Sequence, residues 1–285
     1  MSLQYWYMLP ISVLIATTAM ASGVGGATFF SPLFILALRL PPEVAIGTAL
    51  LTEVFGFASG VWAYARKKLI DYKLGLSLLM ATIPAALLGT WMAGWVPPDF
   101  LKTVLGIGLI GVALSFLRSP EHKDIVRMDA AIGEDFPLPE RVLVTAEGEE
   151  IGYTVCNRLE GRTIAGVGGL FVGLISTGLG ELNSYFLLQR CRVPSRVSVA
   201  TSVFVVAVTA LIASAGHFVQ FFRSGGDVLP TVFSLAIFTV PGVVLGGQLG
   251  SHVASRIPQK TMERALGGLF IIVALLTLGE VLLRG

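Results

Sequence analysis

The sequence predicts an all-α integral membrane protein built from two homologous halves, which we expect to be inverted repeats. Three observations predict this class: an apolar composition, a series of long apolar segments, and a pattern that occurs twice. Hydrophobic residues make up 54% of the 285 residues and charged residues only 13%, and the mean hydropathy is +0.79. Soluble domains carry about 25% charged residues. The composition therefore indicates that lipid surrounds most of the folded chain.

Most of the apolar segments are long enough to cross a bilayer, because a membrane-spanning helix needs about 20 apolar residues. They cover residues 5–22, 26–38, 43–65, 74–95 and 100–117, and then 163–178, 181–190, 195–222, 229–253 and 262–283. Segments 26–38 and 181–190 are too short to cross as helices. We therefore expect each half to form a hairpin with a short broken half-helix, followed by three full transmembrane helices.

The first apolar segment raises the question of a cleaved signal peptide. Its end, Ala19-Met20-Ala21, resembles a signal-peptidase site, but no basic residue precedes Arg39. A secretory signal needs a positively charged start. We expect the first span to be retained.

A polar segment separates the two halves and defines three regions. Residues 1–118 form the first membrane repeat, residues 119–160 an extramembrane and cytoplasmic insertion, and residues 161–285 the second repeat. In the insertion, acidic residues outnumber basic ones. The alternating runs 141–145 and 151–155, joined by a turn at 147–150, suggest a small β-hairpin, with a solvated linker as the alternative.

The repeat is the most informative feature of the sequence. Residues 40–49 align without gaps with residues 193–202, at an offset of 153 positions that pairs Pro41 with Pro194. The same offset pairs Gly25 with Gly178 and Ser31 with Ser184. The segment Pro84 to Gly89 matches Pro241 to Gly246 further on. Matched prolines and glycines are difficult to obtain from apolar composition alone.

The charges of the loops indicate the orientation of the halves, because short cytoplasmic loops collect Lys and Arg. Basic clusters occur at residues 66–73, 190–196 and 256–264. All three can lie in the cytoplasm only if each short segment turns back towards the side of the membrane from which the preceding span came. The second half is then inverted relative to the first. If segments 5–38 and 163–190 were instead single broken spans, the repeats would be parallel.

The two short segments follow glycine-rich breaks, and these breaks predict a binding site. Inverted repeats with interrupted helices are typical of secondary transporters, whose substrates bind where the broken helices meet. Glycine exposes backbone N–H groups, and the start of a half-helix carries partial positive charge, which suits an anion. Close helix packing is the alternative role for these glycines. The candidate binding residues are Gly23, Gly25, Gly26 and Thr28 in the first break, and Gly178, Gly180, Asn183 and Ser184 in the second.

Three hydroxyl groups near the start of the following helices are further candidates for substrate binding. They belong to Thr48 in the first half and to Thr201 and Ser202 in the second. Each could donate a hydrogen bond to an oxyanion. The alternative is a bond back to the backbone of the same helix.

Two acidic residues within apolar segments are candidates for proton coupling. Ionisable groups are rare inside membranes, so Glu53 and Glu181 count as functional candidates. Glu181 could bind a proton together with an anionic substrate. It could equally cap the half-helix that it begins.

The paired motifs resemble the sulfite exporter TauE/SafE family of permeases. They are Ser22-Gly23-Val24-Gly25-Gly26, Pro32-Leu33, Ala45-Ile46-Gly47-Thr48-Ala49 and Ala200-Thr201-Ser202-Val203-Phe204, and the resemblance covers residues 9–118 and 163–283. It implies a multi-pass protein of the cell inner membrane that transports sulfite, sulfonates or related organic anions, with an ion gradient as the suggested driving force. Glu181 and Asn183 depart from the usual glycine run of the family and leave the substrate open.

The composition and motifs also argue against other classes. A net charge of +2 gives no reason to expect nucleic acid as a partner, and the spacing of Cys156 and Cys191 suits neither a metal nor a cofactor. An intramembrane protease could use Ser59 with His217, but the spacing around Ser59 is wrong and no third group supports the pair. A non-transporting scaffold would not need duplicated helix breaks. The expected partners are a small anion and the lipid bilayer, and the sequence is compatible with a homo-oligomer.

Overall fold

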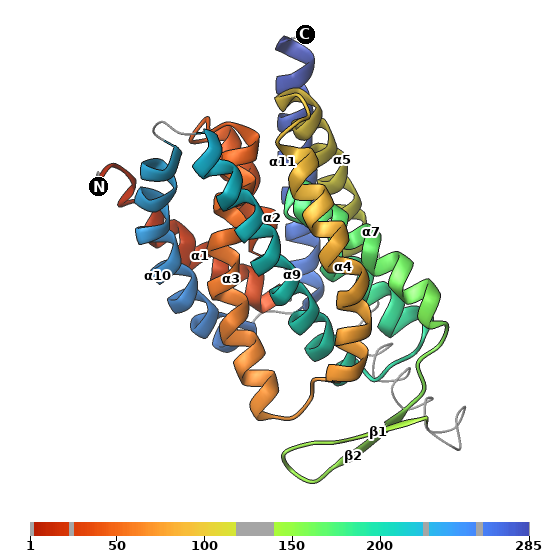
Figure 1. Ribbon diagram of the computed structural model, residues 1–285. Coiled ribbons are helices and arrows are strands. Elements are labelled where there is room, and N and C mark those ends of the chain that lie inside the picture. The colour runs from red at the N-terminus through yellow and green to blue at the C-terminus, as the bar shows by residue number, and fades with distance from the viewer. Residues whose placement is uncertain (1–2, 23–25, 118–139, 225–227, 255–258, 285) are drawn as a thin grey trace.

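The computed structural model describes residues 3–22, 26–117, 140–224, 228–254 and 259–284, and most of them form helices that run side by side (Figure 1). The first half contains a 3₁₀ turn η1 (Leu3–Tyr5) and helices α1 (Met8–Ser22), α2 (Ala27–Leu36), α3 (Pro42–Arg66), α4 (Tyr72–Ala93) and α5 (Pro98–Leu117). Strands β1 (Arg141–Val144) and β2 (Glu150–Tyr153) follow. The second half contains α7 (Arg158–Ile175), α8 (Leu179–Ser184), the π-helix η2 (Tyr185–Arg190), α9 (Ser195–Ser224), α10 (Val228–Ala254) and α11 (Gln259–Arg284).

Six of the described helices are long and apolar enough to cross a membrane. They are α3, α4, α5, α9, α10 and α11, the three full spans expected in each half. Large apolar side chains cover their outer surfaces, as on α11, where Ile272, Leu275 and Leu276 are exposed. Such a surface is stable only against lipid. The predicted all-α, multi-pass membrane fold is confirmed.

Local sequence explains where several helices begin. Pro42 opens α3, a position at which the missing N–H costs nothing. The Asp71 side chain accepts a hydrogen bond from the Leu74 N–H at the start of α4. The Asn157 side chain does the same for the first turn of α7, where it accepts from Leu159 and Glu160.

In two helix pairs, a helix of one half packs against a helix of the other half. α1 packs mainly against α10 of the other half, and α7 packs mainly against α4. Each pair runs parallel: positions along α7 approach α4 in ascending order, as do positions along α1 and α10. The next largest contacts join α5 to α11 and α3 to α9. These pairings are the ones expected if a two-fold axis related the two halves. The inverted repeat itself stays a prediction.

Two glycines that match in the sequence repeat allow these pairs to approach closely. A Cβ atom on Gly89 would lie 2.2 Å from the carbonyl oxygen of Leu170, and one on Gly246 would lie 2.4 Å from that of Val13. Neither distance is sterically possible, so backbone meets backbone at both positions. Such contacts are common where small residues line membrane helix interfaces.

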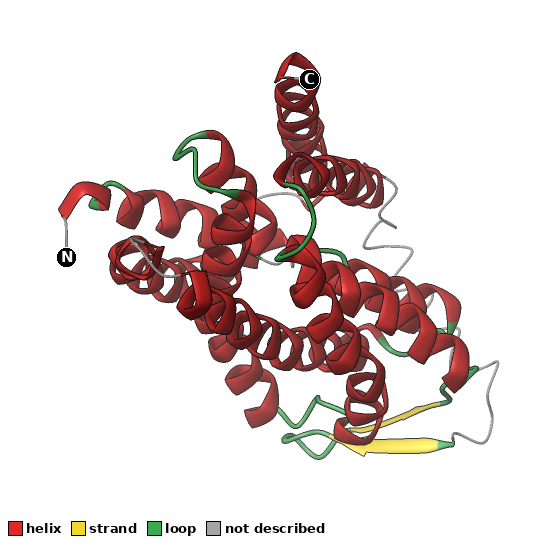
Figure 2. Cartoon of the chain, turned by 45° about the horizontal axis from the view of Figure 1, so that its top comes forward, coloured by secondary structure: helices red, strands yellow, loops and turns green. Residues whose placement is uncertain are grey.

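The hairpin β1–β2 lies at one end of the helices, which we call the hairpin face; Figure 2 shows it at the edge of the molecule. The strands are antiparallel, with Arg141 opposite Tyr153 and Val144 opposite Glu150. The sequence predicts strands at 141–145 and 151–155. The expected insertion of 119–160 overlaps α7, which begins at Arg158, and its residues 119–139 lie outside the described chain.

Candidate functional site

The helix break of the second half is a left-handed turn between α7 and α8. Ser176 has φ +61° and Gly178 has φ +104°. The left-handed region suits glycine, whereas Ser176 adopts it at an energetic disadvantage. Its hydroxyl group is buried and donates to the carbonyl oxygen of Ile175. Helical structure therefore stops at Ile175 and restarts at Leu179.

The break of the first half lies between α1 and α2. α1 ends at Ser22, and Gly26 forms the N-cap of α2 without a side-chain hydrogen bond. The predicted binding residues Gly23 and Gly25 lie outside the described residues. The half-helix that follows, α2, is 10 residues long. It cannot cross a bilayer, which needs about 20 residues.

The two breaks contact each other in the interior. The hydroxyl groups of Thr28 and Thr177 lie 2.9 Å apart, and those of Ser31 and Ser176 also share a hydrogen bond. All four side chains are buried. The structure therefore brings the first turns of α2 together with the residues that interrupt the second half, although the two segments lie about 150 positions apart in the chain.

Glu53 occupies the start of α2. Its carboxyl oxygen Oε1 accepts a hydrogen bond of 3.1 Å from the backbone N–H of Ala27, the first residue of α2. The side chain is buried, and its helix α3 packs against α2. A carboxyl oxygen therefore lies where an anionic substrate is expected from the sequence.

Glu181 occupies the corresponding place in the second half. Its carboxyl group interacts with the backbone N–H groups of Gly178 and of Glu181 itself. This is the capping arrangement raised as an alternative above. Glu181 is also close enough to Glu53 for the two carboxyl groups to interact electrostatically.

Asn183 offers a buried donor on α8. The residue is 1% exposed, and its amide Nδ2 has no hydrogen-bond partner in the described structure. Buried polar groups are nearly always paired, so an unpaired one calls for a ligand or a water molecule. Of the other candidates on α8, Gly180 approaches Val206 and Ser184 is half-buried.

The three hydroxyl candidates on α3 and α9 are buried, and two have other partners. Thr48 donates to the carbonyl oxygen of Val44 in its own helix, at 2.7 Å. Thr201 accepts a hydrogen bond from the backbone N–H of Asp71, at the start of α4. Ser202 is 5% exposed. A substrate could bind Thr48 or Thr201 only in competition with these bonds, and their predicted role stays a prediction.

A cavity of about 100 Å³, which we call the inner cavity, adjoins the first break. Glu53 and Gly26 line it together with apolar side chains of α1, α2, α3, α9 and α10. Its volume suits a small molecule rather than a large ligand. The carboxyl group of Glu53 thus lies between the inner cavity and the first amide of α2.

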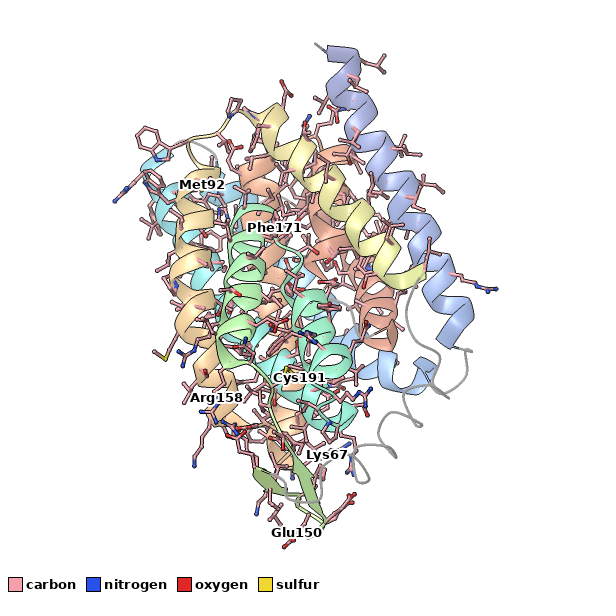
Figure 3. All side chains as sticks on the ribbon, turned by 90° about the vertical axis from the view of Figure 1, so that its right-hand side faces the viewer. Lys67, Met92, Glu150, Arg158, Phe171 and Cys191 are labelled. Carbon is pink, nitrogen blue, oxygen red and sulfur yellow. A yellow bond between two sulfur atoms is a disulfide. The ribbon has the colours of Figure 1, made fainter. Side chains whose placement is uncertain are left out.

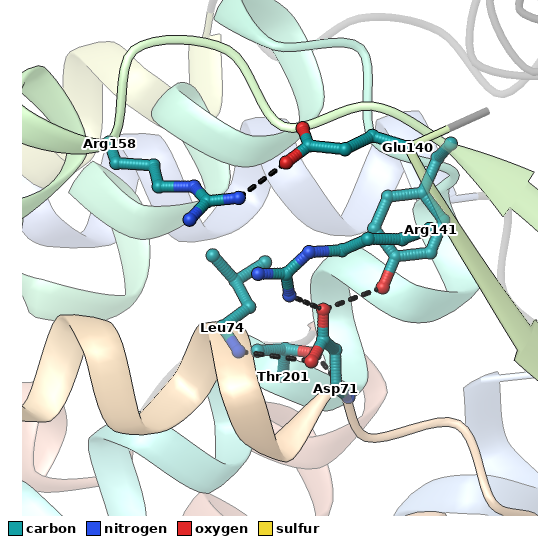
Figure 4. A network of polar contacts seen from close by, with 7 residues as sticks. Asp71, Leu74, Glu140, Arg141, Arg158 and Thr201 are labelled. Carbon is teal, nitrogen blue, oxygen red and sulfur yellow. Dashed lines mark hydrogen bonds and ion pairs between the residues drawn. The ribbon is translucent and has the colours of Figure 1, made fainter. Parts of the chain in front are cut away.

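A polar network that the sequence analysis did not identify fixes the hairpin to the helices (Figure 4). The carboxylate of Asp71 accepts hydrogen bonds from Arg141 of β1 and from the hydroxyl group of Tyr153 of β2. Burial would raise the pKa of Asp71, but the bonds from Leu74, Tyr153 and Arg141 outweigh burial and lower it. Asp71 directly precedes an apolar helix, which is a helix-capping signal in the sequence, but its partners lie about 70 positions away.

The two cysteines are joined. Cys156 and Cys191 form a disulfide that links the end of the hairpin to the segment after η2. Figure 3 labels Cys191 near Arg158 at the hairpin face, together with Lys67 and Glu150. Two cysteines 35 positions apart give no sign of this in the sequence, because only the fold brings them together. Disulfides persist in oxidising compartments, whereas the basic loops of this face indicate the cytoplasm.

Comparisons with known proteins agree with this architecture. The chain is 26% identical over 273 residues to the probable membrane transporter protein YunE of Bacillus subtilis (strain 168), covering 93% of this chain and 94% of that protein. It is 27% identical over 265 residues to the probable membrane transporter protein YjnA of the same organism, covering 89% of this chain and 92% of that protein. A shorter match, 34% identical over 101 residues, is to the probable membrane transporter protein ORF9 of Sinorhizobium sp, covering 35% of this chain and 38% of that protein.

No solved structure matches the chain significantly. The family model described as sulfite exporter TauE/SafE matches residues 8–277, which include both breaks, five of the six long apolar helices described and most of the sixth, α11. The bacterial relatives and the membrane spans together place the chain in the inner membrane as a multi-pass protein. The protein belongs to the sulfite exporter TauE/SafE family.

Proposed function

We propose that this protein is a secondary transporter of small oxyanions, of which sulfite and organosulfonates are the first candidates, and that the anion binds where the two helix breaks meet. One observation carries the proposal: buried hydroxyl pairs join the breaks, and a carboxyl oxygen already accepts a hydrogen bond from the first amide of α2. The position therefore accommodates an acceptor oxygen. The family name and the names of the relatives support transport, and the family name supports sulfite.

Glu53 acts in this proposal as an internal substitute for the substrate. While the carboxyl group is ionised, it occupies the Ala27 N–H and repels an incoming anion. Protonation removes the charge and weakens the hydrogen bond to the amide, since bonds to charged groups are the stronger ones. The amide then becomes available to an oxyanion. Proton and anion would consequently bind together.

Glu181 supplies a second group of the same kind. Its carboxyl group covers the amides at the start of α8, close to Glu53. An anion placed between the two half-helices would meet both carboxylates. The unpaired Nδ2 of Asn183, on the same turn of helix, is an additional donor for it. Neutralising at least one carboxylate is therefore a condition for binding in this proposal.

The inverted arrangement of the halves belongs to the same proposal. It is supported by the exchange of partners, in which α1 packs on α10 and α7 packs on α4. In transporters built this way, one bundle rocks against the other around a fixed central site. Here the central site would lie between α2 and α8.

Uptake by purified protein in sealed vesicles tests the proposal. Radiolabelled sulfite or sulfoacetate should enter faster when the outside is made acidic, because protonation frees the amide of Ala27. In Glu53→Gln, which cannot ionise, uptake should lose most of this dependence on pH. Asp99→Asn removes an exposed carboxylate that does not line the inner cavity and should behave as the wild type.

Two results would count against the proposal. If sulfite, sulfate, thiosulfate, sulfoacetate and simple carboxylates all fail to cross, the protein does not transport small anions. If uptake persists with unaltered pH dependence in both Glu53→Gln and Glu181→Gln, anions are transported but neither carboxyl group carries the proton.

A further inference from the structure

A second cavity lies at the hairpin face, and we call it the hairpin-side cavity. It has a volume of about 380 Å³ and is bounded by the end of α3 with the following loop, the turn of the β-hairpin and the start of α9. Its lining includes Tyr64, Lys67, Ala146, Glu147, Arg196 and Val199. Apart from Tyr64 and Val199, none of these residues lines the inner cavity.

The hairpin-side cavity and the inner cavity share two lining residues. Tyr64 of α3 and Val199 of α9 contribute to both. Glu53 lies on the same helix as Tyr64, eleven positions earlier, which corresponds to about 16 Å along the helix axis. The two cavities therefore adjoin at Tyr64 and Val199.

Lys67 is the cation that this cavity offers to an anion. Arg196 also lines the cavity but forms an ion pair of 2.6 Å with Glu149. Lys67 is exposed, and its neighbours Arg66 and Lys68 are exposed as well. A cluster of like charges at the mouth of a cleft raises the local concentration of the opposite ion. The nearby Glu147 offsets only part of this charge.

The walls of the hairpin-side cavity are held in place by the hairpin. The N–H of Ala146 donates a hydrogen bond of 3.1 Å to the carbonyl oxygen of Lys67. The Asp71 network and the disulfide hold the open end of the hairpin against the helices. The backbone of Lys67 is thus tied to the turn of the hairpin, while its side chain reaches solvent.

The opposite end of the α3–α9 pair carries a different set of charges. A cavity of about 760 Å³ there is lined by Glu43, Gln220 and Arg223, among others. In the sequence repeat, with its offset of 153, Gln220 corresponds to Lys67 and Glu43 corresponds to Arg196. Glu43 and Arg223 offset one another, and the position equivalent to Lys67 is neutral. Lys67 therefore distinguishes the two ends.

We propose that the hairpin-side cavity is an access site for the transported anion, in which Lys67 captures the anion and Tyr64 with Val199 separates it from the inner cavity. This inference rests on the proposed transport of anions. The ligand is a small oxyanion with one or two negative charges, small enough to enter a cavity of 100 Å³ afterwards. Lys67 sets the affinity at the mouth and does not take part in the central site.

The test is the concentration dependence of anion counterflow in proteoliposomes that contain the full chain. Lys67→Glu should raise the KM for sulfite or sulfoacetate about tenfold, and Lys67→Gln by less, with Vmax changed less than about twofold, because only capture is affected. Lys73→Glu is the matched control. Lys73 is exposed at the start of α4 and does not line the cavity. The KM of Lys73→Glu should stay within about twofold of the wild-type KM. Added salt should reduce the difference between Lys67→Glu and the wild type.

Other outcomes overturn the inference in different ways. An unchanged KM in Lys67→Glu, with normal transport by the wild type, excludes capture by Lys67 and leaves the proposed function intact. Equal increases in Lys67→Glu and Lys73→Glu would mean a diffuse surface charge without a specific access site. Absence of counterflow in the wild type overturns the proposed function and this inference together.

Discussion

Thr28 and Thr177 share a hydrogen bond of 2.9 Å between buried hydroxyl groups, one in each half of the chain. The bond joins the first turn of α2 to the break that precedes α8. It has a counterpart one helical turn further along, between Ser31 and Ser176. The two helix breaks therefore form one unit in the interior. A substitution at one break should affect the structure of the other.

The first prediction concerns this contact. Thr28→Val and Thr177→Val keep the shape of the side chain and remove the hydroxyl group. Each should lower stability in detergent by about 1 kcal/mol, and the double variant should lose less than the sum, with a coupling of about 0.6 kcal/mol. Thermal unfolding of the three variants gives these values. Thr103→Val, where the hydroxyl group bonds within its own helix at an exposed position, is the control. Strictly additive losses would mean that the two hydroxyl groups do not interact.

A second prediction concerns the close contact between α4 and α7. Gly89→Ala places a methyl group 2.2 Å from the carbonyl oxygen of Leu170, so the helices must separate. Overpacking of this kind costs about 1–3 kcal/mol. Gly111→Ala, where nothing lies within 4 Å of the added Cβ, should be neutral or slightly stabilising, since alanine favours helix. The midpoints of thermal unfolding distinguish the two variants. Equal midpoints would contradict the close packing of α4 on α7.

A third prediction concerns pH and the attachment of the hairpin. Hydrogen bonds and the Arg141 guanidinium lower the pKa of Asp71 despite its burial. Burial raises the pKa of the Tyr153 hydroxyl group, and the hydrogen bond to Asp71 raises it further. A carboxyl group with a lowered pKa stabilises the fold fully above its unfolded value of about 3.9, and this stabilisation is lost as the pH falls through the lowered value. Attachment of the hairpin should therefore be constant from about pH 5 to 8 and weaken only in stronger acid.

Hydrogen exchange of residues 141–153, corrected for the intrinsic effect of pH, measures this attachment. Asp71→Asn should increase exchange at neutral pH, because it leaves Arg141 without its anionic partner. Glu140→Gln removes an ion pair with Arg158 in which both side chains are about half exposed, and it should have little effect. If hairpin exchange rises steadily between pH 8 and 5 in the wild type, Asp71 does not control the attachment.

A fourth prediction concerns the disulfide between Cys156 and Cys191. The intact protein should react with a maleimide mass tag only after reduction, and it should then gain two tags. Cys156→Ser should lower stability by about 2–4 kcal/mol, the usual effect of removing a disulfide. Two tags without reduction in membranes from fresh cells would show that the thiols are free there. That result would agree with the cytoplasmic position that the basic loops indicate.

The parts of the fold that depend on neighbouring residues could be predicted from the sequence. The short segment after Gly178, the start of α3 at Pro42 and the six long spans all follow from local composition. The partners of buried groups could not be predicted in this way. The N–H of Ala27 receives Glu53 from 26 positions away, and Asp71 receives Arg141 from 70 positions away. Which side chain fills a helix start depends on how whole helices are arranged, and one sequence does not encode that arrangement as a pattern.

The candidate binding residues show the same difference between what the sequence predicts and what it does not. Thr28 and Gly178 lie where the two breaks meet, as their places in the motifs suggest. Thr48 and Thr201 have the same place in the sequence repeat, yet one bonds to its own helix and the other to the Asp71 backbone. The repeat equates positions along the chain, but it does not equate their surroundings: Thr201 meets the start of α4, where the hairpin is bonded to Asp71.

The packing of α1 against α10 has a consequence for biosynthesis. A ribosome delivers α1 to the membrane at the beginning of translation, yet its main partner emerges only after about two hundred further residues have been made. Until then the surface of α1 that meets Gly242 and Gly246 faces lipid. Insertion must therefore end with a lateral closing step in which late helices dock against early ones. Two separately encoded fragments, divided within residues 118–139, should find each other in the bilayer when they are produced in the same cell.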